Sequence, residues 1–241
     1  MTESIYNAVG SFTPYRPILN SLLTNDAPSE NGWCENALQS IENYPSLYKN
    51  HICPIAVKYL NIIKVNENNH YISNGCKYLY YKLYETVYNK PEYIDFTYEF
   101  YKKLLKEYIS KETNTFEDNT EKINDDIFGK LKNLDELYDN FNKYKKSEEC
   151  SKGSCGCAKK CVHLYDTYLS ECYKNYNTPF CVELQKFAES FNEYLRENNG
   201  CNKTIEELKL FNKYNSRIAI IGSGVVLVVI VFSLFTLYKV S

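Results

Sequence analysis

Cysteine is the residue type with the most obvious chemistry in this 241-residue chain, because all ten cysteines precede one long apolar segment. They are Cys34, Cys53, Cys76, Cys150, Cys155, Cys157, Cys161, Cys172, Cys181 and Cys201. A dense, even-numbered set of this kind is typical of a disulfide framework formed in an oxidising compartment. Three cysteines are N-terminal and seven are C-terminal, so full pairing within the chain requires at least one bridge between the groups. The sequence leaves the pairing open.

The densest part of this set, from Cys150 to His163, also has the residue types of a metal site. Structural zinc sites usually present Cys-x(2–4)-Cys pairs, often two of them. Here the successive cysteines from Cys150 to Cys161 are separated by four, one and three residues. We interpret the cluster as disulfides in a compact hairpin and expect no metal or other cofactor. A metal-binding module is the weaker alternative.

Catalytic motifs are not evident. The three histidines, His51, His70 and His163, do not lie in a recognisable nucleophile motif, and the chain has no phosphate-binding loop and no H-E-x-x-H sequence. We therefore expect no enzymatic activity and no small-molecule substrate. Acidic and basic residues alternate along the chain, and the net charge is −2, which gives no basic patch for a nucleic acid.

The apolar segment at 218–238 has the length and composition of a transmembrane helix. Its 21 residues include no charge, and at a rise of 1.5 Å per residue they span roughly 31 Å, close to the thickness of a bilayer core. This divides the chain into an ectodomain at 1–217, a span in the lipid bilayer and a short tail at 239–241. A buried soluble helix, a glycolipid-anchor signal and a tail-anchored protein with a cytosolic bulk are the alternatives.

The N-terminal sequence lacks the basic region and the apolar region of a secretory signal. We therefore expect the C-terminal span to direct membrane entry as well as to anchor the chain. The cysteines favour an ectodomain in an oxidising or extracellular space. The weak excess of basic residues before the span favours the opposite orientation.

Apolar periodicity predicts an all-α ectodomain. Residues 1–32 contain Pro14, Pro17, Pro28 and Gly32 and are expected to be an irregular lead-in, and 110–120 a polar loop. The expected helices or apolar segments are 54–64, 76–89, 94–108, 123–144, 162–176 and 181–196. A last helix is expected from Thr204, where the sequence matches a capping box, and should continue into the span. We expect the 24 tyrosines to replace Phe or Leu in the core rather than to form a binding surface. Asn202, in Asn-Lys-Thr, is the one glycosylation sequence.

The order of these features resembles the Plasmodium interspersed repeat superfamily, in particular its Vir-type members. The resemblance covers nearly the whole chain, and its more specific parts are the block NGCKYLYYKLYE at 74–85 and the sequence FNKYN at 211–215 before the span. It implies a helical, disulfide-bonded variant surface antigen without enzymatic activity. Members of this family commonly lack a signal peptide, as here. The short tail at 239–241 departs from the longer tails that are common in the family.

The resemblance further implies export to the infected erythrocyte membrane, antigenic variation, immune evasion and adhesion, with a host-cell receptor or antibodies as partners. The polar loops near 64–75 and 110–120 are the expected variable contact surface, because exposed loops tolerate change best. No classical export signal is present, since Arg16-Pro17-Ile18 breaks that pattern. A membrane-tethered scaffold inside the parasite or its vacuole is the alternative.

Overall fold

The computed structural model describes residues 4–24, 34–36, 38, 41, 48–66, 68–87, 89–111, 121–148, 155–198, 200–201 and 203–211. Every regular element that spans several residues in these ranges is a helix, and none of them is a strand. The predicted all-α class is therefore confirmed for the described part of the chain.

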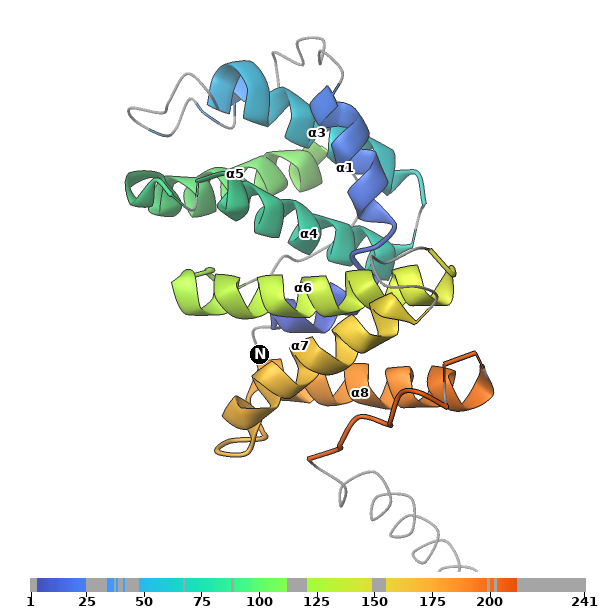
Figure 1. Ribbon diagram of the computed structural model, residues 1–241. Coiled ribbons are helices and arrows are strands. Elements are labelled where there is room, and N and C mark those ends of the chain that lie inside the picture. Colours follow the sequence, from blue (N-terminus) through green and yellow to red (C-terminus); the bar gives the residue numbers. More distant parts are fainter. Residues whose placement is uncertain are drawn as a thin grey trace, which may run out of the picture.

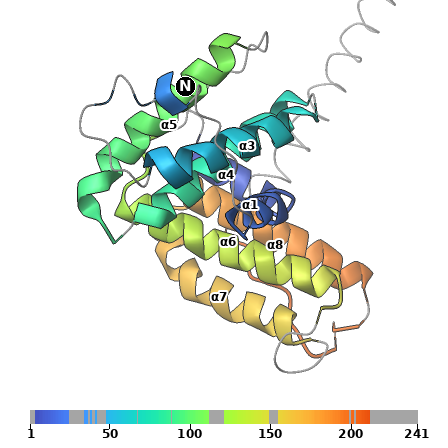
Figure 2. The ribbon, with the colours of Figure 1, turned by 90° about the horizontal axis from the view of Figure 1, so that it is seen from above.

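The helices form two groups that meet at α6 (Figure 1). Their bounds are η1 Ile5–Ser11, α1 Tyr15–Thr24, η2 Tyr48–Ile52, α3 Cys53–Lys64, α4 Asn69–Val87, η3 Pro91–Tyr93, α5 Ile94–Lys111, α6 Asp125–Lys145, α7 Gly156–Cys172 and α8 Pro179–Glu197. One group consists of α1, α3, α4 and α5, and the other of α6, α7 and α8. The short helix η1 contacts α4, α6 and α8, so it lies where the groups join. Figure 2 shows the same arrangement from above.

Local signals fix where the longest helices begin. The Asn124 side chain accepts a hydrogen bond from the amide of Ile127 at 2.9 Å, and two aspartates occupy the first turn of α6. Both features satisfy or complement the positive end of a helix. Thr178 caps α8 in the same way, and Pro179 occupies the first turn, where its missing amide hydrogen costs nothing.

Tyrosine supplies much of the core, as predicted. The tyrosines with less than 2 % of their surface exposed are Tyr15, Tyr48, Tyr59, Tyr78, Tyr80, Tyr81, Tyr84, Tyr101 and Tyr165. The Tyr80 and Tyr101 rings stack with their centroids 4.5 Å apart, which joins α4 to α5. Tyr59 donates its hydroxyl hydrogen to the carbonyl of Gly75 at 2.9 Å, which joins α3 to α4. These rings therefore fill the interior and also satisfy backbone groups across helix pairs.

The prediction of an irregular lead-in at 1–32 is wrong for residues 5–11 and 15–24, which are helical. Ser4 caps η1 by accepting a hydrogen bond from Tyr6, and α1 follows with Pro17 in its first turn. Prolines are tolerated there because the first amides of a helix have no partner within it. Tyr15 and Leu19 of α1 and the apolar side chains of η1 enter the core, as does Phe12 between the two helices.

Two further boundaries differ from the sequence prediction. The helix expected from Cys76 begins at Asn69, because Asn68 accepts hydrogen bonds from the amides of His70 and Tyr71 at 2.9 and 3.1 Å. Part of the expected contact loop at 64–75 is therefore helical, and Gly75 is buried within it. The helix expected from Val162 begins at Gly156, inside the predicted cysteine-rich turn.

The last predicted helix, from Thr204, is not formed as far as the chain is described, up to residue 211. Residues 203–211, here called the strap, are not helical and run along the second group of helices. The Thr204 hydroxyl donates to the carbonyl of Cys201 at 3.1 Å instead of capping a following turn. The capping-box sequence was therefore misleading.

Among the helices that the structure describes, none has the length and apolar character needed to cross a bilayer. The predicted span at 218–238, the tail at 239–241 and residues 112–120 of the predicted polar loop lie outside the described residues. Residues 110 and 111 of that loop belong to the end of α5.

Candidate binding site at the C-terminal strap

Disulfides join three pairs of described cysteines. Cys34 is bonded to Cys53, Cys155 to Cys201 and Cys172 to Cys181. Cys157 is also disulfide-bonded, and Cys150 lies outside the described residues. None of the three bridges connects the N-terminal group of cysteines to the C-terminal group. Each one instead braces a local connection: the start of α3, the start of α7 and the α7–α8 turn.

Cys76 and Cys161 differ from the predicted set, because the structure holds both as buried thiols. The Cys161 thiol donates to the carbonyl of Leu137 on α6 at 3.8 Å. Burial raises the pKa of this thiol to about 12, which keeps it protonated and unreactive. Cys76 belongs to the N-terminal group and Cys161 to the C-terminal group, so each group keeps an even number of other cysteines. A bridge between the two groups is therefore no longer required.

The proposed metal cluster at Cys150–His163 is not assembled in the described residues. Cys155 is used in its bridge to Cys201, and His163 is exposed on α7. Within the parts of the chain that the structure describes, no three His, Cys, Asp or Glu residues are placed to hold a metal ion. The other histidines lie apart from this region, His51 beside α3 and His70 at the start of α4.

The strap is the most specifically held irregular segment of the described chain. The Cys155–Cys201 bridge fixes the chain just before it. The Asn192 side chain then binds Leu208 in both directions: its amide donates to the Leu208 carbonyl at 2.8 Å, and its carbonyl accepts from the Leu208 amide at 2.7 Å. Ile205 and Leu208 bury their side chains. The side-chain amide thus replaces the backbone partners that a helix would have supplied.

A further hydrogen bond holds the end of the strap against α7. The Tyr165 hydroxyl donates to the carbonyl of Lys209 at 2.6 Å. Burial raises the pKa of this tyrosine above its usual range, with nearby acidic and tyrosine side chains adding to the effect. The hydroxyl therefore remains a donor at physiological pH, and the strap stays attached as far as its last described residues.

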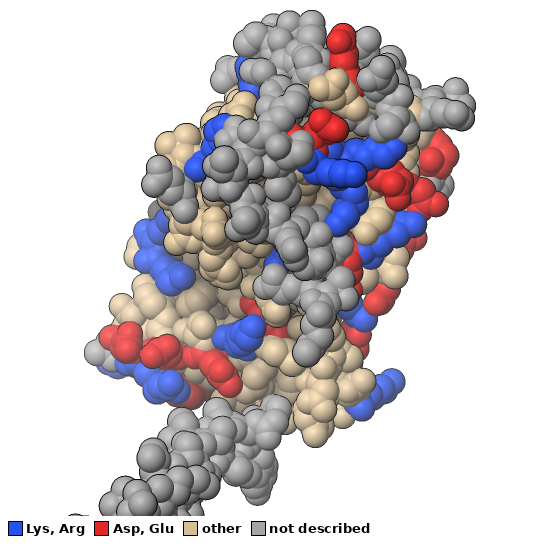
Figure 3. Space-filling view, turned by 180° about the vertical axis from the view of Figure 1, so that it is seen from behind, with Lys and Arg blue, Asp and Glu red and all other residues tan. Residues whose placement is uncertain are grey.

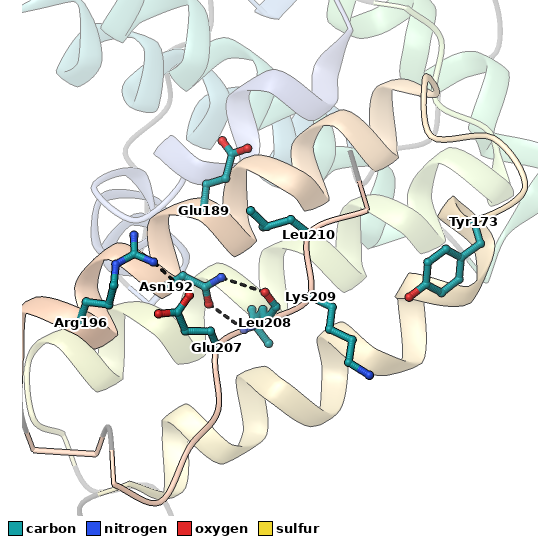
Figure 4. A pocket seen from close by; sticks show the side chains of 8 residues that line it. All are labelled: Tyr173, Glu189, Asn192, Arg196, Glu207, Leu208, Lys209 and Leu210. Atoms are coloured by element: carbon teal, nitrogen blue, oxygen red, sulfur yellow. Dashed lines mark hydrogen bonds and ion pairs between the residues drawn. The ribbon is translucent and has the colours of Figure 1, made fainter. Parts of the chain in front are cut away.

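A hollow of about 460 Å³ opens between the strap, α8 and the end of α7 (Figure 4). It is lined by Tyr173, Glu189, Asn192, Arg196, Glu207, Leu208, Lys209 and Leu210. Arg196 and Glu207 form an ion pair at 3.0 Å on one side. In Figure 4 the Asn192–Leu208 pair lies beside it, and Tyr173 and Lys209 lie toward the other side.

The lining of this hollow contains no serine, cysteine or histidine, so no Ser–His or Cys–His pair faces it. The Asn192 amide and carbonyl are both occupied by the strap backbone. The remaining charged groups lie at the surface, where exposed ion pairs contribute little to stability.

A second cluster of charged groups, distant in sequence, lies between the two helical groups. Arg16 of α1 forms an ion pair with the buried Asp135 of α6, and Asp139 lies 3.9 Å from the Arg16 Nε atom. Tyr81 of α4 donates to the other Asp135 oxygen at 3.4 Å. Burial raises the pKa of Asp135 to about 6, although the Arg16 guanidinium opposes that rise. We interpret this cluster as a structural link between the two groups of helices.

A separate apolar hollow of about 290 Å³ lies between α1, α3 and α4. Leu23, Ile55 and Leu83 contribute to its walls, and His51 lies at its border. Lys82 and Thr86 of α4 also line it.

Sequence reasoning missed both Asn192 and the Arg16–Asp135 pair. Asn192 follows Phe191 on α8 and is one turn after Ala188, both on the buried face of that helix. A lone amide on an apolar face indicates that a backbone segment must pack there. The signal was present for Asn192, whereas nothing in the spacing of Arg16 and Asp135 connects them. Asn202, the predicted glycosylation residue, lies outside the described residues.

Comparison with protein-family models, with curated proteins and with solved structures finds no match to this chain.

Proposed function

We propose that this chain is a membrane-tethered variant surface antigen, which displays a disulfide-braced helical ectodomain and acts by adhesion and immune evasion. The resemblance to Vir-type members of the Plasmodium interspersed repeat superfamily supplies the biological setting: export to the infected erythrocyte membrane, with a host-cell receptor or antibodies as partners. The proposal rests on one structural observation, the way in which the strap is bound to the helical domain shortly before the expected span in the sequence.

The strap binds the end of the domain at several independent points. A disulfide fixes Cys201, Asn192 binds the backbone of Leu208, and Tyr165 binds that of Lys209. Only six residues separate the last described residue, Phe211, from the expected span at 218–238. A domain held this firmly next to its anchor is suited to stable display, because a pull on the anchor is borne by a covalent bridge and by buried hydrogen bonds.

The bridges also support the orientation of the proposed anchor. Disulfides persist in oxidising compartments and are rare in the cytosol. Three bridges between described cysteines therefore favour an ectodomain on the extracellular or lumenal side of the membrane. The tail-anchored alternative would place the same bridges in a reducing compartment.

On the face in Figure 3, acidic and basic side chains are interspersed and form no patch of a single sign that would suggest a nucleic-acid partner. A mixed surface of this kind tolerates substitution without a large change in folding, because most surface replacements alter stability by less than about 0.5 kcal/mol. That property suits an antigen whose exterior varies around a conserved helical core.

The test is expression of the full chain, with an N-terminal epitope tag, in a eukaryotic cell with an oxidising secretory pathway. We expect the tag to be labelled by antibody on intact cells, and the protein to stay in the membrane fraction after carbonate extraction. The double variant Val228→Arg with Val229→Arg should be extracted from the membrane fraction by carbonate, because each central arginine costs about 2.5–3.5 kcal/mol of insertion free energy. The control, Val228→Leu with Val229→Leu, should behave like the unchanged chain.

Two outcomes would contradict the proposal. Extraction of the unchanged chain by carbonate would show that 218–238 is not an anchor. A tag that is labelled only after permeabilisation would exclude surface display and favour the internal scaffold instead. Mass spectrometry of the non-reduced protein should also recover the peptide pair that contains Cys155 and Cys201.

A further inference from the structure

The α7–α8 turn exposes more aromatic and apolar surface than the described structure requires for folding. Of the six large apolar or aromatic side chains that are exposed in the described residues, three belong to this turn and the start of α8. They are Tyr173, Tyr176 and Val182, with 64, 47 and 40 % of their surfaces exposed. Elsewhere in the molecule tyrosines are buried in the core, so the residue type alone does not explain why Tyr173 and Tyr176 are exposed.

A disulfide holds this turn in a fixed shape. Cys172 ends α7 and Cys181 lies in the first turn of α8, and the bridge between them closes a loop with a sequence separation of nine residues. Because the loop is already ordered, contact with another surface costs little conformational entropy. Lys174, between the two tyrosines, is also exposed.

The strap ends at the same end of the molecule. Tyr173 and Leu210 line one hollow, and Tyr165 of α7 binds the backbone of Lys209. Figure 1 shows the α7–α8 turn and the end of the strap together at the bottom of the view, whereas α1, α3 and α5 lie toward the top. The turn that carries the exposed tyrosines and the end of the strap therefore lie at the same end of the molecule.

The distance from this end to the proposed anchor is short. Six residues separate Phe211 from the expected span, and even a fully extended chain of that length reaches only roughly 20 Å. The end of the domain that carries Tyr173, Lys174 and Tyr176 is thus held close to the bilayer surface. Tyrosine and lysine are suited to that boundary, since each has an apolar body and a polar end.

We propose that the α7–α8 turn rests on the membrane that holds the span, with Tyr173 and Tyr176 in the headgroup region and Lys174 directed to the lipid phosphates. This inference depends on the proposed tether. It fixes the orientation of the ectodomain: the turn lies against the bilayer, and the opposite end, with α1, α3 and α5, faces away from the membrane. A protein partner for the turn is less favoured, because the tether leaves little space between this end and the bilayer.

The experiment uses the full chain reconstituted into phosphatidylcholine vesicles, with a tryptophan placed in the turn as the probe. Tyr176→Trp is compared with Val65→Trp, which replaces a residue that is 76 % exposed in the turn between α3 and α4. Both variants retain Trp33, so the spectrum of the unchanged chain is subtracted. Half of each sample is prepared with lipids that are brominated near the headgroup, since bromine quenches a tryptophan that it contacts. Flotation with the vesicles and a helical circular-dichroism spectrum are measured for every sample.

We expect the fluorescence added by Tyr176→Trp to shift to the blue in vesicles and to lose most of its intensity with brominated lipid. The fluorescence added by Val65→Trp should be unchanged. If the chain floats but Tyr176→Trp is quenched no more than Val65→Trp, the membrane contact is excluded while the tether stands. If the chain does not float at all, the tether fails, and this inference fails with it.

Discussion

At the scale of single residues, tyrosine does two jobs that phenylalanine or leucine could not combine. Its ring fills the interior, and its hydroxyl satisfies a backbone or carboxylate group on another element. Tyr15, for example, is almost fully buried and donates to the carbonyl of Tyr71 at 2.7 Å. Tyr80 accepts from the amide of Ile123 at 3.1 Å and so binds the entry to α6. Replacing such a residue by phenylalanine would keep the ring but leave a buried backbone group without its partner, at a cost of about 1–3 kcal/mol.

Close packing around Gly75 gives the first prediction. A β-carbon added at this position would lie 2.8 Å from the Ile63 side chain and 3.1 Å from the Tyr15 ring. Gly75→Ala should therefore destabilise the fold, because overpacking costs about 1–3 kcal/mol and exceeds the gain of about 0.5–1 kcal/mol from replacing glycine inside a helix. Gly129→Ala is the matched control, since it lies inside α6 with nothing within 4 Å of the added carbon, and it should stabilise by about 0.5–1 kcal/mol. Urea denaturation of the oxidised proteins measures both, and a stabilising Gly75→Ala would contradict the packing.

Asp135 gives the second prediction, which concerns pH. Because burial raises its pKa in the folded protein to about 6, the folded state holds a proton that the unfolded state releases near pH 4. The free energy of unfolding should therefore fall as the pH rises from about 4 to about 6, by up to about 3 kcal/mol, and Asp135 should contribute no further change above that range.

The measurement is urea denaturation at a series of pH values. Asp135→Asn should remove most of the dependence between pH 4 and 6. Asp139→Asn is the control on the next turn of α6, where the carboxylate is about one-third exposed and lies 3.9 Å from Arg16, and it should leave the dependence in place. Equal slopes for Asp135→Asn and the unchanged chain would show that Asp135 is ionised throughout this range.

At the scale of elements, α8 and the strap form one unit, although they follow each other through a turn and not through a regular connection. Asn192→Ala, the third prediction, should free the strap, because it leaves the buried amide and carbonyl of Leu208 without partners at a cost of about 1–3 kcal/mol. Hydrogen exchange at Leu208 should become faster by one to two orders of magnitude. Glu193→Ala, on the exposed side of the same turn, should leave that exchange unchanged. Normal protection of Leu208 in Asn192→Ala would contradict the role of this side chain.

The same elements show what the sequence could predict. The regular spacing of apolar residues located α5 and α6 nearly to their ends, since a single buried stripe determines such helices. The strap could not be predicted in this way, because its conformation depends on Asn192 and Cys155, which are distant in sequence. η1 was missed for a related reason: its seven residues carry no repeated pattern, and its burial comes from contacts with α4, α6 and α8. The candidate site could not be predicted either, because the strap forms one of its walls, although the sequence did indicate that the cysteines near it form disulfides.

At the scale of the whole molecule, packing and not disulfides joins the two groups of helices in the described structure. The three bridges between described cysteines are local, with sequence separations of 19, 46 and 9 residues. The connection between the groups instead passes through η1, where Ile5 is fully buried, and through the aromatic contacts of Phe128 on α6 with Tyr81 and Tyr84 on α4. The domain should therefore unfold as one unit even though its covalent braces act separately.

The fourth prediction separates these two kinds of support by native-state hydrogen exchange. Ile5→Ala should cost about 2–5 kcal/mol, because it leaves a cavity where η1 meets α4, α6 and α8. It should lower the protection of α4 and α8 by similar amounts, since both lose the same partner. Cys155→Ser with Cys201→Ser should instead lower protection in the strap and at the start of α7, and leave α4 as it was. If the loss of this bridge lowered the protection of α4 as strongly as Ile5→Ala does, the strap would be part of the cooperative core. If protection fell only in the strap and at the start of α7, the strap could loosen while the displayed domain stays folded.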